Sequence, residues 1–318
     1  MTPEDPLAPP GDPFEIAPDP IADVNTRRQS ELRLRIMSAA VMAVIVVGLA
    51  YAGGLPFRVL SVVVGLVVLQ EWSAMTGCLR PFGFAQGFTV VSMIVVSVLV
   101  LMGNYSGALV TSLIAFLAAL VISFVRLRTA SRAQEARHWS WLSMGFLYAT
   151  GIMVAFATLR GDSAFGLAAC AFILAVVWAT DIFAYFVGKS LGGPKLAPSI
   201  SPNKTWSGFF GGVLFAVLAG AAVLGAYVWK GVLPGNVWWF VAVAVLLSIV
   251  SQCGDLFESW VKRRSGAKDS GRIIPGHGGL MDRIDGLGAA AVAALALLVF
   301  TTGGTDMNDA LFAALDRR

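Results

Sequence analysis

Charged residues are scarce in this sequence. Only 13% of its 318 residues are Asp, Glu, Lys or Arg, whereas an ordinary soluble domain carries about 25%. Hydrophobic residues make up 57% of the chain, and the mean hydropathy is +0.76. This composition excludes a water-soluble globular protein and indicates a protein embedded in a membrane.

Cysteine is also rare. The chain has three, Cys78, Cys170 and Cys253, which lie far apart and in or beside apolar runs, without the paired spacing of metal or redox motifs. We therefore expect them to be small core residues and assign them no chemistry.

What the sequence does contain is a series of apolar runs of about 20 residues. A helix of this length covers about 30 Å of hydrocarbon at about 1.5 Å per residue. The runs predict an all-α fold, a polytopic integral membrane helix bundle of about nine transmembrane helices. The expected spans are 36–53, 57–75, 84–103, 107–125, 139–159, 166–187, 208–229, 237–258 and 280–300.

The two ends of the chain differ from the apolar middle. Residues 1–30 are rich in proline and acidic residues, so we expect a disordered tail there. Residues 31–302 are predicted to form the transmembrane domain, and residues 303–318 a short C-terminal tail. The start of the chain does not resemble a cleaved signal peptide, so the first span is expected to direct insertion.

Basic residues are distributed unevenly among the predicted loops. If the N-terminus is cytoplasmic, most of the 23 Lys and Arg residues fall on the cytoplasmic side, in segments 27–35, 126–137, 188–207 and 259–279. The positive-inside rule therefore favours this orientation. Both polar segments of the second half lie on that side, so a site built from them faces the cytoplasm. We expect a bacterial-type inner membrane.

Ionisable side chains inside spanning helices are costly and indicate functional sites. Here they come in pairs, three or four residues apart near the cytoplasmic ends of three predicted helices, so each pair lies on one helix face. Carboxylates that converge repel each other unless a cation lies between them, and oxygen ligands suit Mg²⁺. Separate, solvated carboxylates are the alternative. The pairs are Asp181 and Tyr185, Asp255 and Glu258, and Asp282 and Asp285.

Basic side chains and glycines surround these acidic groups. Carboxylates that hold a metal, cations that neutralise oxygens, and glycines that let backbone N–H groups approach are what a metal-bound polyphosphate requires. The positive-inside bias alone is the competing explanation. The basic residues are Lys204, Lys262, Arg263, Arg264, Lys268, Arg272, His277 and Arg283, and the glycines are Gly276, Gly278 and Gly279.

The run SWVKRRSGAKDSGRIIPGHGGLMDRIDG, Ser259 to Gly286, resembles the signature of the phosphatidate cytidylyltransferases, also called CDP-diacylglycerol synthases. The segments GDLFES, SPNKTWSG and DIFAYFVG, which begin at Gly254, Ser201 and Asp181, also look like family segments. The resemblance covers roughly residues 30–300. One departure is Ser207, where the family commonly has glutamate. The proline-rich tail is not part of the family pattern.

The resemblance implies that the protein transfers CMP from CTP to phosphatidic acid and releases pyrophosphate. It implies Mg²⁺ as the cofactor, and the sequence leaves open whether a monovalent cation assists. A homodimer is expected at the level of the family, and no nucleic acid partner is expected. By the same resemblance, the metal ligands are Asp181, Asp255, Asp282 and Asp285. The catalytic residues are Lys204, Lys268, Asp282, Arg283 and Asp285. The substrate-binding residues are Ser201, Lys204, Thr205, Ser259, Lys262, Arg263, His277, Gly278 and Gly279.

Two other classes of function remain. An ion-coupled transporter would use intramembrane acids as relays, but it predicts polar, broken helices in both halves, and the polar segments here lie in the second half. Another metal-dependent lipid-phosphate transferase or a lipid kinase would share the metal, the phosphate and the membrane. The choice of nucleotide separates these enzymes from a cytidylyltransferase.

Overall fold

The computed structural model describes residues 37–38, 40–78, 83–128, 133–162, 164–229, 237–271, 273–274 and 278–302. The predicted tails, 1–30 and 303–318, lie outside these residues. Within them, eight helices are long and apolar enough to cross a membrane. They are α2 (Gly54–Met75), α3 (Phe84–Leu101), α4 (Tyr105–Leu127), α5 (Ala133–Arg160), α6 (Ala164–Leu191), α7 (Trp206–Trp229), α8 (Val237–Arg264) and α9 (Met281–Thr302).

The predicted all-α bundle is confirmed, and the chain is a multi-pass membrane protein. Eight of the predicted runs correspond to the eight long helices. The first run, 36–53, contains a shorter apolar helix, Ala40–Ala52. That helix is followed by Gly53 and Gly54, both with positive φ, a conformation that glycine adopts without steric cost.

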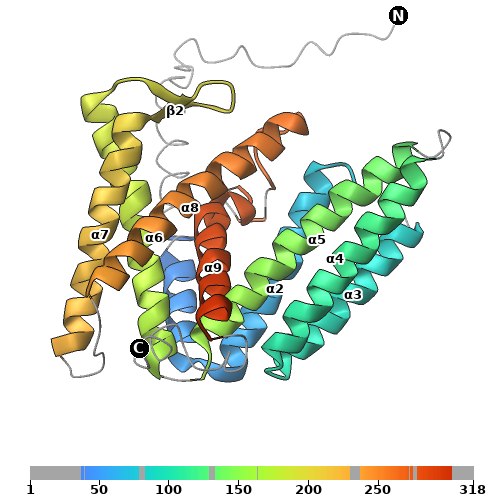
Figure 1. Cartoon of the computed structure of the whole chain (residues 1–318), viewed down its shortest axis with the longest axis horizontal. Coiled ribbons are helices and arrows are strands. Elements are labelled where there is room, and N and C mark those ends of the chain that lie inside the picture. Colours follow the sequence, from blue (N-terminus) through green and yellow to red (C-terminus); the bar gives the residue numbers. More distant parts are fainter. Residues whose placement is uncertain are drawn as a thin grey trace, which may run out of the picture.

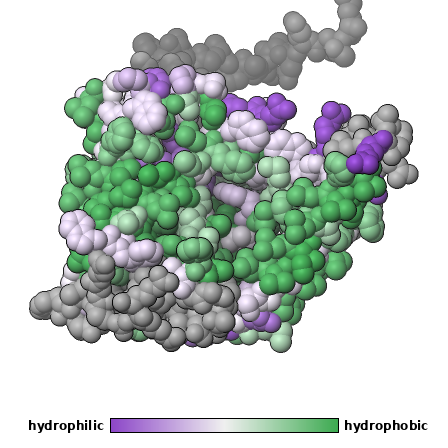
Figure 2. All heavy atoms as spheres, in the orientation of Figure 1, coloured by the Kyte–Doolittle hydropathy of each residue, from purple (hydrophilic) through white to green (hydrophobic). Residues whose placement is uncertain are grey.

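The helices form two groups with a pair between them. Figure 1 shows α3, α4 and α5 side by side on one flank, α6 and α7 on the other, and α8 and α9 between the two groups. The close helix pairs include α6 with α7, α4 with α5, and α8 with α9. In Figure 2 hydrophobic side chains cover the visible flanks, while hydrophilic ones gather mainly at the end where the hairpin lies. The flanks are therefore suited to contact lipid.

Three polar stretches depart from the predicted boundaries. The helix α8 continues past the expected end at residue 258 to Arg264, so the first residues of the family signature are helical. The helix α6 likewise continues to Leu191. The polar segment after it forms an antiparallel hairpin of β1 (Lys195–Ala197) and β2 (Ser201–Thr205). Hydropathy located the apolar spans but gave no signal for these polar continuations.

The helices α6 and α7 pack with their backbones nearly in contact. A Cβ atom on Gly208 would lie 2.5 Å from the carbonyl oxygen of Ala184, and one on Gly212 would lie 3.0 Å from that of Thr180. Small residues four apart allow such close approach between membrane helices. This contact fixes the start of α7, and with it the end of the hairpin, against α6.

We predict that Gly208→Ala destabilises the protein, because the added Cβ would meet backbone that cannot rotate away. Overpacking of this kind typically costs about 1–3 kcal/mol. Thermal unfolding in detergent measures the effect. Gly225→Ala in the same helix is the control, since a Cβ there meets nothing within 4 Å, and it should unfold at the wild-type temperature or slightly above. Equal midpoints for both variants would contradict the close packing.

Candidate active site

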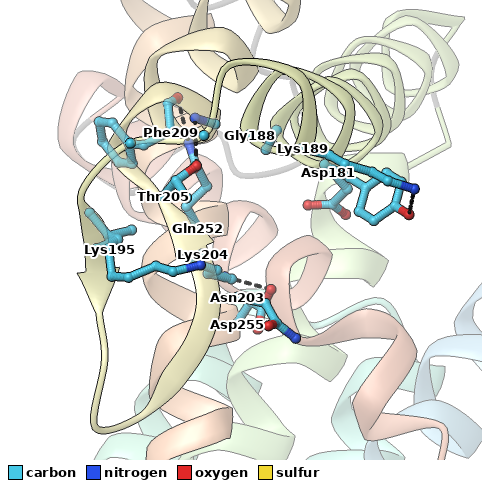
Figure 3. A pocket seen from close by; sticks show the side chains of 16 residues that line it. Asp181, Gly188, Lys189, Lys195, Asn203, Lys204, Thr205, Phe209, Gln252 and Asp255 are labelled. Carbon is cyan, nitrogen blue, oxygen red and sulfur yellow. Dashed lines mark hydrogen bonds and ion pairs between the residues drawn. The ribbon is translucent and has the colours of Figure 1, made fainter.

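A cavity of about 660 Å³ lies between the end of α6, the β-hairpin, the start of α7 and the last part of α8. Most of its polar lining comes from side chains of α6, the hairpin and α8. In Figure 3, Asp181 and Lys189 lie on one side of this space, and Lys204 and Asp255 on another. The polar lining residues are Asp181, Tyr185, Lys189, Lys195, Asn203, Lys204, Thr205, Gln252 and Asp255.

An ion pair crosses the cavity. Lys204 Nζ on β2 lies 2.6 Å from Asp255 Oδ2 on α8, and both side chains are partly exposed, at 25% and 37%. Ser259 Oγ donates a long hydrogen bond of 3.4 Å to the other Asp255 oxygen. The pair therefore fixes the hairpin against α8 while remaining accessible to a ligand.

Thr205 and Ser207 hold the base of the hairpin. Thr205 Oγ1 accepts a hydrogen bond of 3.2 Å from the Gly208 amide, which is the pattern of a helix N-cap. Ser207 Oγ donates to the carbonyl oxygen of Gly192. At the position where the family commonly has glutamate, this chain thus has a hydroxyl that joins α7 to the end of α6. Thr205 lines the cavity but is also a structural residue.

A second cluster of charges lies where α8 meets α9. Lys262 Nζ on α8 lies 3.2 Å from Glu258 Oε2 and 2.7 Å from Asp282 Oδ1. The other Asp282 oxygen accepts a bond of 2.9 Å from the Ser270 amide, and the Asp282 amide donates to Ser270 Oγ at 3.3 Å. Lys262 and Ser270 therefore determine where the Asp282 carboxylate lies.

Asp285 lies near the start of α9, where that helix packs against α8. On the other side of α8, Asp255 lines the same cavity as Asp181 of α6. The helices α8 and α9 approach closely here, since a Cβ on Gly254 would lie 2.8 Å from the Asp285 carbonyl oxygen. Glycine at this position lets the two helices bring their carboxylates together.

The remaining predicted residues lie around this centre. Ser201 begins β2, and Arg263 is exposed and donates from Nε to the Ile200 carbonyl at 3.5 Å. Lys268 and Arg283 are exposed, and neither is among the residues of the described chain that line the cavity.

The glycine run is only partly described. Gly278 pairs with Ile274 in an isolated antiparallel bridge, and Gly279 is buried beside Ser270. His277 and Arg272 lie outside the described residues.

The acidic residues suit Mg²⁺ in chemistry, because they offer only oxygen atoms as ligands. The described residues contain no group of three or more His, Cys, Asp or Glu side chains placed to hold an ion by themselves. Mg²⁺, however, is usually bound by one or two carboxylates together with substrate phosphates and water. Glu258 is fully buried, and within the described chain its Oε1 has no hydrogen-bond partner. An oxygen-only set with one unpartnered buried oxygen fits such an ion.

Sequence reasoning missed Glu71 on α2. Its carboxylate is 2% exposed and accepts hydrogen bonds from the amides of Leu280 and Met281, at 2.9 and 2.7 Å, and from Ser270 Oγ at 3.3 Å. The sequence does carry a signal for Glu71, because a single carboxylate within the apolar run 57–75 indicates a functional residue. Lys189, Lys195, Asn203 and Gln252 of the cavity were also missed.

Comparison with known proteins identifies the family of this chain. The sequence model of the Cytidylyltransferase family matches residues 33–301. A phosphatidate cytidylyltransferase of Brucella suis is 43% identical over 284 residues, which cover 89% of this chain and 98% of that protein. One from Bacillus subtilis is 32% identical, over 80% of this chain and 93% of that protein. The chain therefore belongs to the cytidylyltransferase family.

Proposed function

We propose that this protein transfers CMP from CTP to phosphatidic acid, which gives CDP-diacylglycerol and pyrophosphate. The observation that carries the proposal is the cavity in which Lys204 and the acidic side chains of α6 and α8 meet at one end of a membrane-spanning bundle. Cations and carboxylates there suit a metal-bound nucleoside triphosphate, while the surrounding helices suit a lipid. The relatives, which are named phosphatidate cytidylyltransferases, support this choice of substrates.

The reaction needs little from the protein beyond placement and charge. The lipid phosphate is already an anion at neutral pH, so one of its oxygens forms a bond to the α-phosphorus of CTP without a general base. The bond between that phosphorus and the bridging oxygen of pyrophosphate breaks, and pyrophosphate leaves with the electron pair. Catalysis of this kind depends on positioning and on neutralisation of oxygen charge.

Different residues supply the positioning and the charge neutralisation. Lys204 is one of three lysines that line the cavity, and it would neutralise phosphate oxygens once a ligand competes for Asp255. Lys262 fixes Asp282 and Glu258 at the junction of α8 and α9. Lys268 and Arg283 are exposed near this junction, and we expect them to contact phosphate when substrate is bound.

We infer that Mg²⁺ is the cofactor. Asp181 and Asp255, which line the same cavity, and Asp285 of the adjoining helix α9 would hold it together with substrate oxygens and water. Asp282, which is bonded to Lys262 and Ser270, would be the fourth acidic residue to contribute. When bound, the ion withdraws negative charge from the departing pyrophosphate.

The proposed cytoplasmic orientation rests on charge. The last turn of α8 carries Lys262, Arg263 and Arg264, and the hairpin carries Lys195 and Lys204. Basic residues collect on the cytoplasmic side of membrane proteins, where CTP is available. We propose an inner membrane on the same ground. The homodimer stays a prediction.

The first prediction of this function concerns the nucleotide. Purified protein in detergent, given phosphatidic acid, Mg²⁺ and one nucleoside triphosphate at a time, should release pyrophosphate with CTP and form CDP-diacylglycerol. A lipid kinase would instead release a nucleoside diphosphate, and mass spectrometry of the lipid distinguishes the two products. Absence of CTP-dependent pyrophosphate release would sink the proposal.

The second prediction concerns Asp282. Asp282→Asn keeps an acceptor for the Ser270 amide but removes the charge that pairs with Lys262, so turnover should fall at least about 100-fold, as when one charge-stabilising group is removed from an active site. Expression should stay intact. Asp162→Asn is the control, since it breaks an ion pair with Arg58 in which Asp162 is 61% exposed, and such pairs contribute about 0–1 kcal/mol. Wild-type turnover in Asp282→Asn would remove Asp282 from the site.

The third prediction separates two roles of the Lys204–Asp255 pair. If the pair only joins the hairpin to α8, the double variant in which the two residues are exchanged, Lys204→Asp with Asp255→Lys, should recover the activity that Lys204→Gln loses. We expect no rescue, because each residue also meets the substrate or its ion. Initial rates at varied CTP measure this, with exposed Arg137→Gln as a control for loss of a positive charge. Recovery of activity in the exchanged variant would make the pair structural.

A further inference from the structure

The buried carboxylate of Glu71 contacts the site from a helix outside it. Glu71 lies in α2, near the other end of the sequence from α9, yet its two oxygens accept bonds from the amides of Leu280 and Met281 at the start of α9. Ser270 Oγ in the preceding loop donates to the same carboxylate. Three donors from the family signature thus converge on one side chain of α2.

The physical reason for a carboxylate here is the start of α9. The first amides of a helix have no intrahelical acceptor, and the helix dipole favours negative charge at this end. An adjacent residue usually supplies the acceptor. At α9 the acceptor comes from another spanning helix, which ties the two helices together. A buried charge is costly unless it is hydrogen bonded, and the three donors satisfy this one.

Two glycines of the family signature lie close to the Glu71 carboxylate. A Cβ atom on Gly271 would lie 2.5 Å from Glu71 Oε1, and one on Gly279 would lie 3.0 Å from the same oxygen. Glycine at both positions therefore permits the signature loop to close over Glu71.

The neighbouring Trp72 fixes α2 itself. Its ring is fully buried, stacks on Phe257 of α8 with ring centroids 6.2 Å apart, and donates from Nε1 to the Trp141 carbonyl at 2.9 Å. The position of Glu71 relative to α8 is thereby set by close packing.

The hydrogen bonds of Glu71 connect it to Asp282 through Ser270. The Ser270 hydroxyl that bonds to Glu71 also accepts from the Asp282 amide, and the Ser270 amide donates to the Asp282 carboxylate. Asp282 follows Met281, whose amide Glu71 binds, and Asp285 lies one turn further along α9.

We propose that Glu71 is a positioning residue that sets the placement of Asp282 and Asp285 by holding Ser270 and the first amides of α9. Its carboxylate does not touch substrate. The proposal rests on the proposed function for its consequence in catalysis, but the structural part stands on the hydrogen bonds alone.

The test uses two variants and one control in the full-length protein. Glu71→Gln keeps the volume but replaces one acceptor oxygen with an NH₂ group, which faces donors. Gly271→Ala keeps the carboxylate but displaces it through the added Cβ. Ser61→Ala is the control, since Ser61 is a fully buried polar residue of the same helix whose hydroxyl bonds only to the Phe57 carbonyl among the described residues.

The first readout is hydrogen–deuterium exchange of peptides that cover 265–285. In Glu71→Gln and Gly271→Ala these amides should exchange faster than in wild type, while the other helices keep wild-type exchange. Ser61→Ala should leave the segment unchanged. Unchanged exchange in both variants would overturn the proposal, and this readout holds whatever reaction the protein catalyses.

The second readout is the change in kcat compared with the change in KM. Both variants should lower kcat by about 10- to 100-fold, as expected when catalytic groups are displaced by about 1 Å, with little change in KM for phosphatidic acid. The rates are taken per folded protein, with thermal unfolding and gel filtration as checks. Wild-type kcat per folded molecule would show Glu71 to be a stability residue only, and would overturn the proposal.

Discussion

The acidic groups of this site depend on donors supplied by other segments of the chain. Lys204 from the hairpin holds Asp255 of α8, Lys262 of α8 holds Asp282 of α9, and the signature loop and the start of α9 hold Glu71 of α2. A carboxylate is costly to bury without donors, so Asp282 and above all the buried Glu71 depend on the docking of their partner segments. The site and the bundle therefore form together.

Hydropathy and helix periodicity predicted much of the arrangement. Runs near 20 residues located the long helices, and the spacing of Asp255 with Glu258 and of Asp282 with Asp285 predicted that α8 and α9 would present acids to a shared place. Those signals are local, since they depend on neighbours three or four residues away. The shared cavity of Asp181 and Asp255, and the contact of the Asp285 backbone with Gly254, follow from them once the helices alternate in direction.

The remaining features depend on tertiary contacts that no local pattern encodes. Glu71 looks like a single polar residue in an apolar run until α9 is placed against it. The hairpin is too short and too polar for a strand pattern to stand out, and α8 continues through Lys262 and Arg264 because basic residues are acceptable at a helix C-terminus. The role of Ser207 as a tie to Gly192 likewise becomes visible only in three dimensions.

The length of α8 has a consequence for how the two substrates meet. At about 1.5 Å per residue, its 28 residues extend about 42 Å, whereas the hydrocarbon layer is about 30 Å thick and the whole bilayer about 40–45 Å. The last turn carries Lys262, Arg263 and Arg264, and charged side chains are costly in hydrocarbon, so we expect this end of α8 to reach the headgroup layer. A lipid phosphate resides at that depth by itself. We therefore expect the lipid to react without leaving its leaflet, so that only the water-soluble nucleotide has to travel.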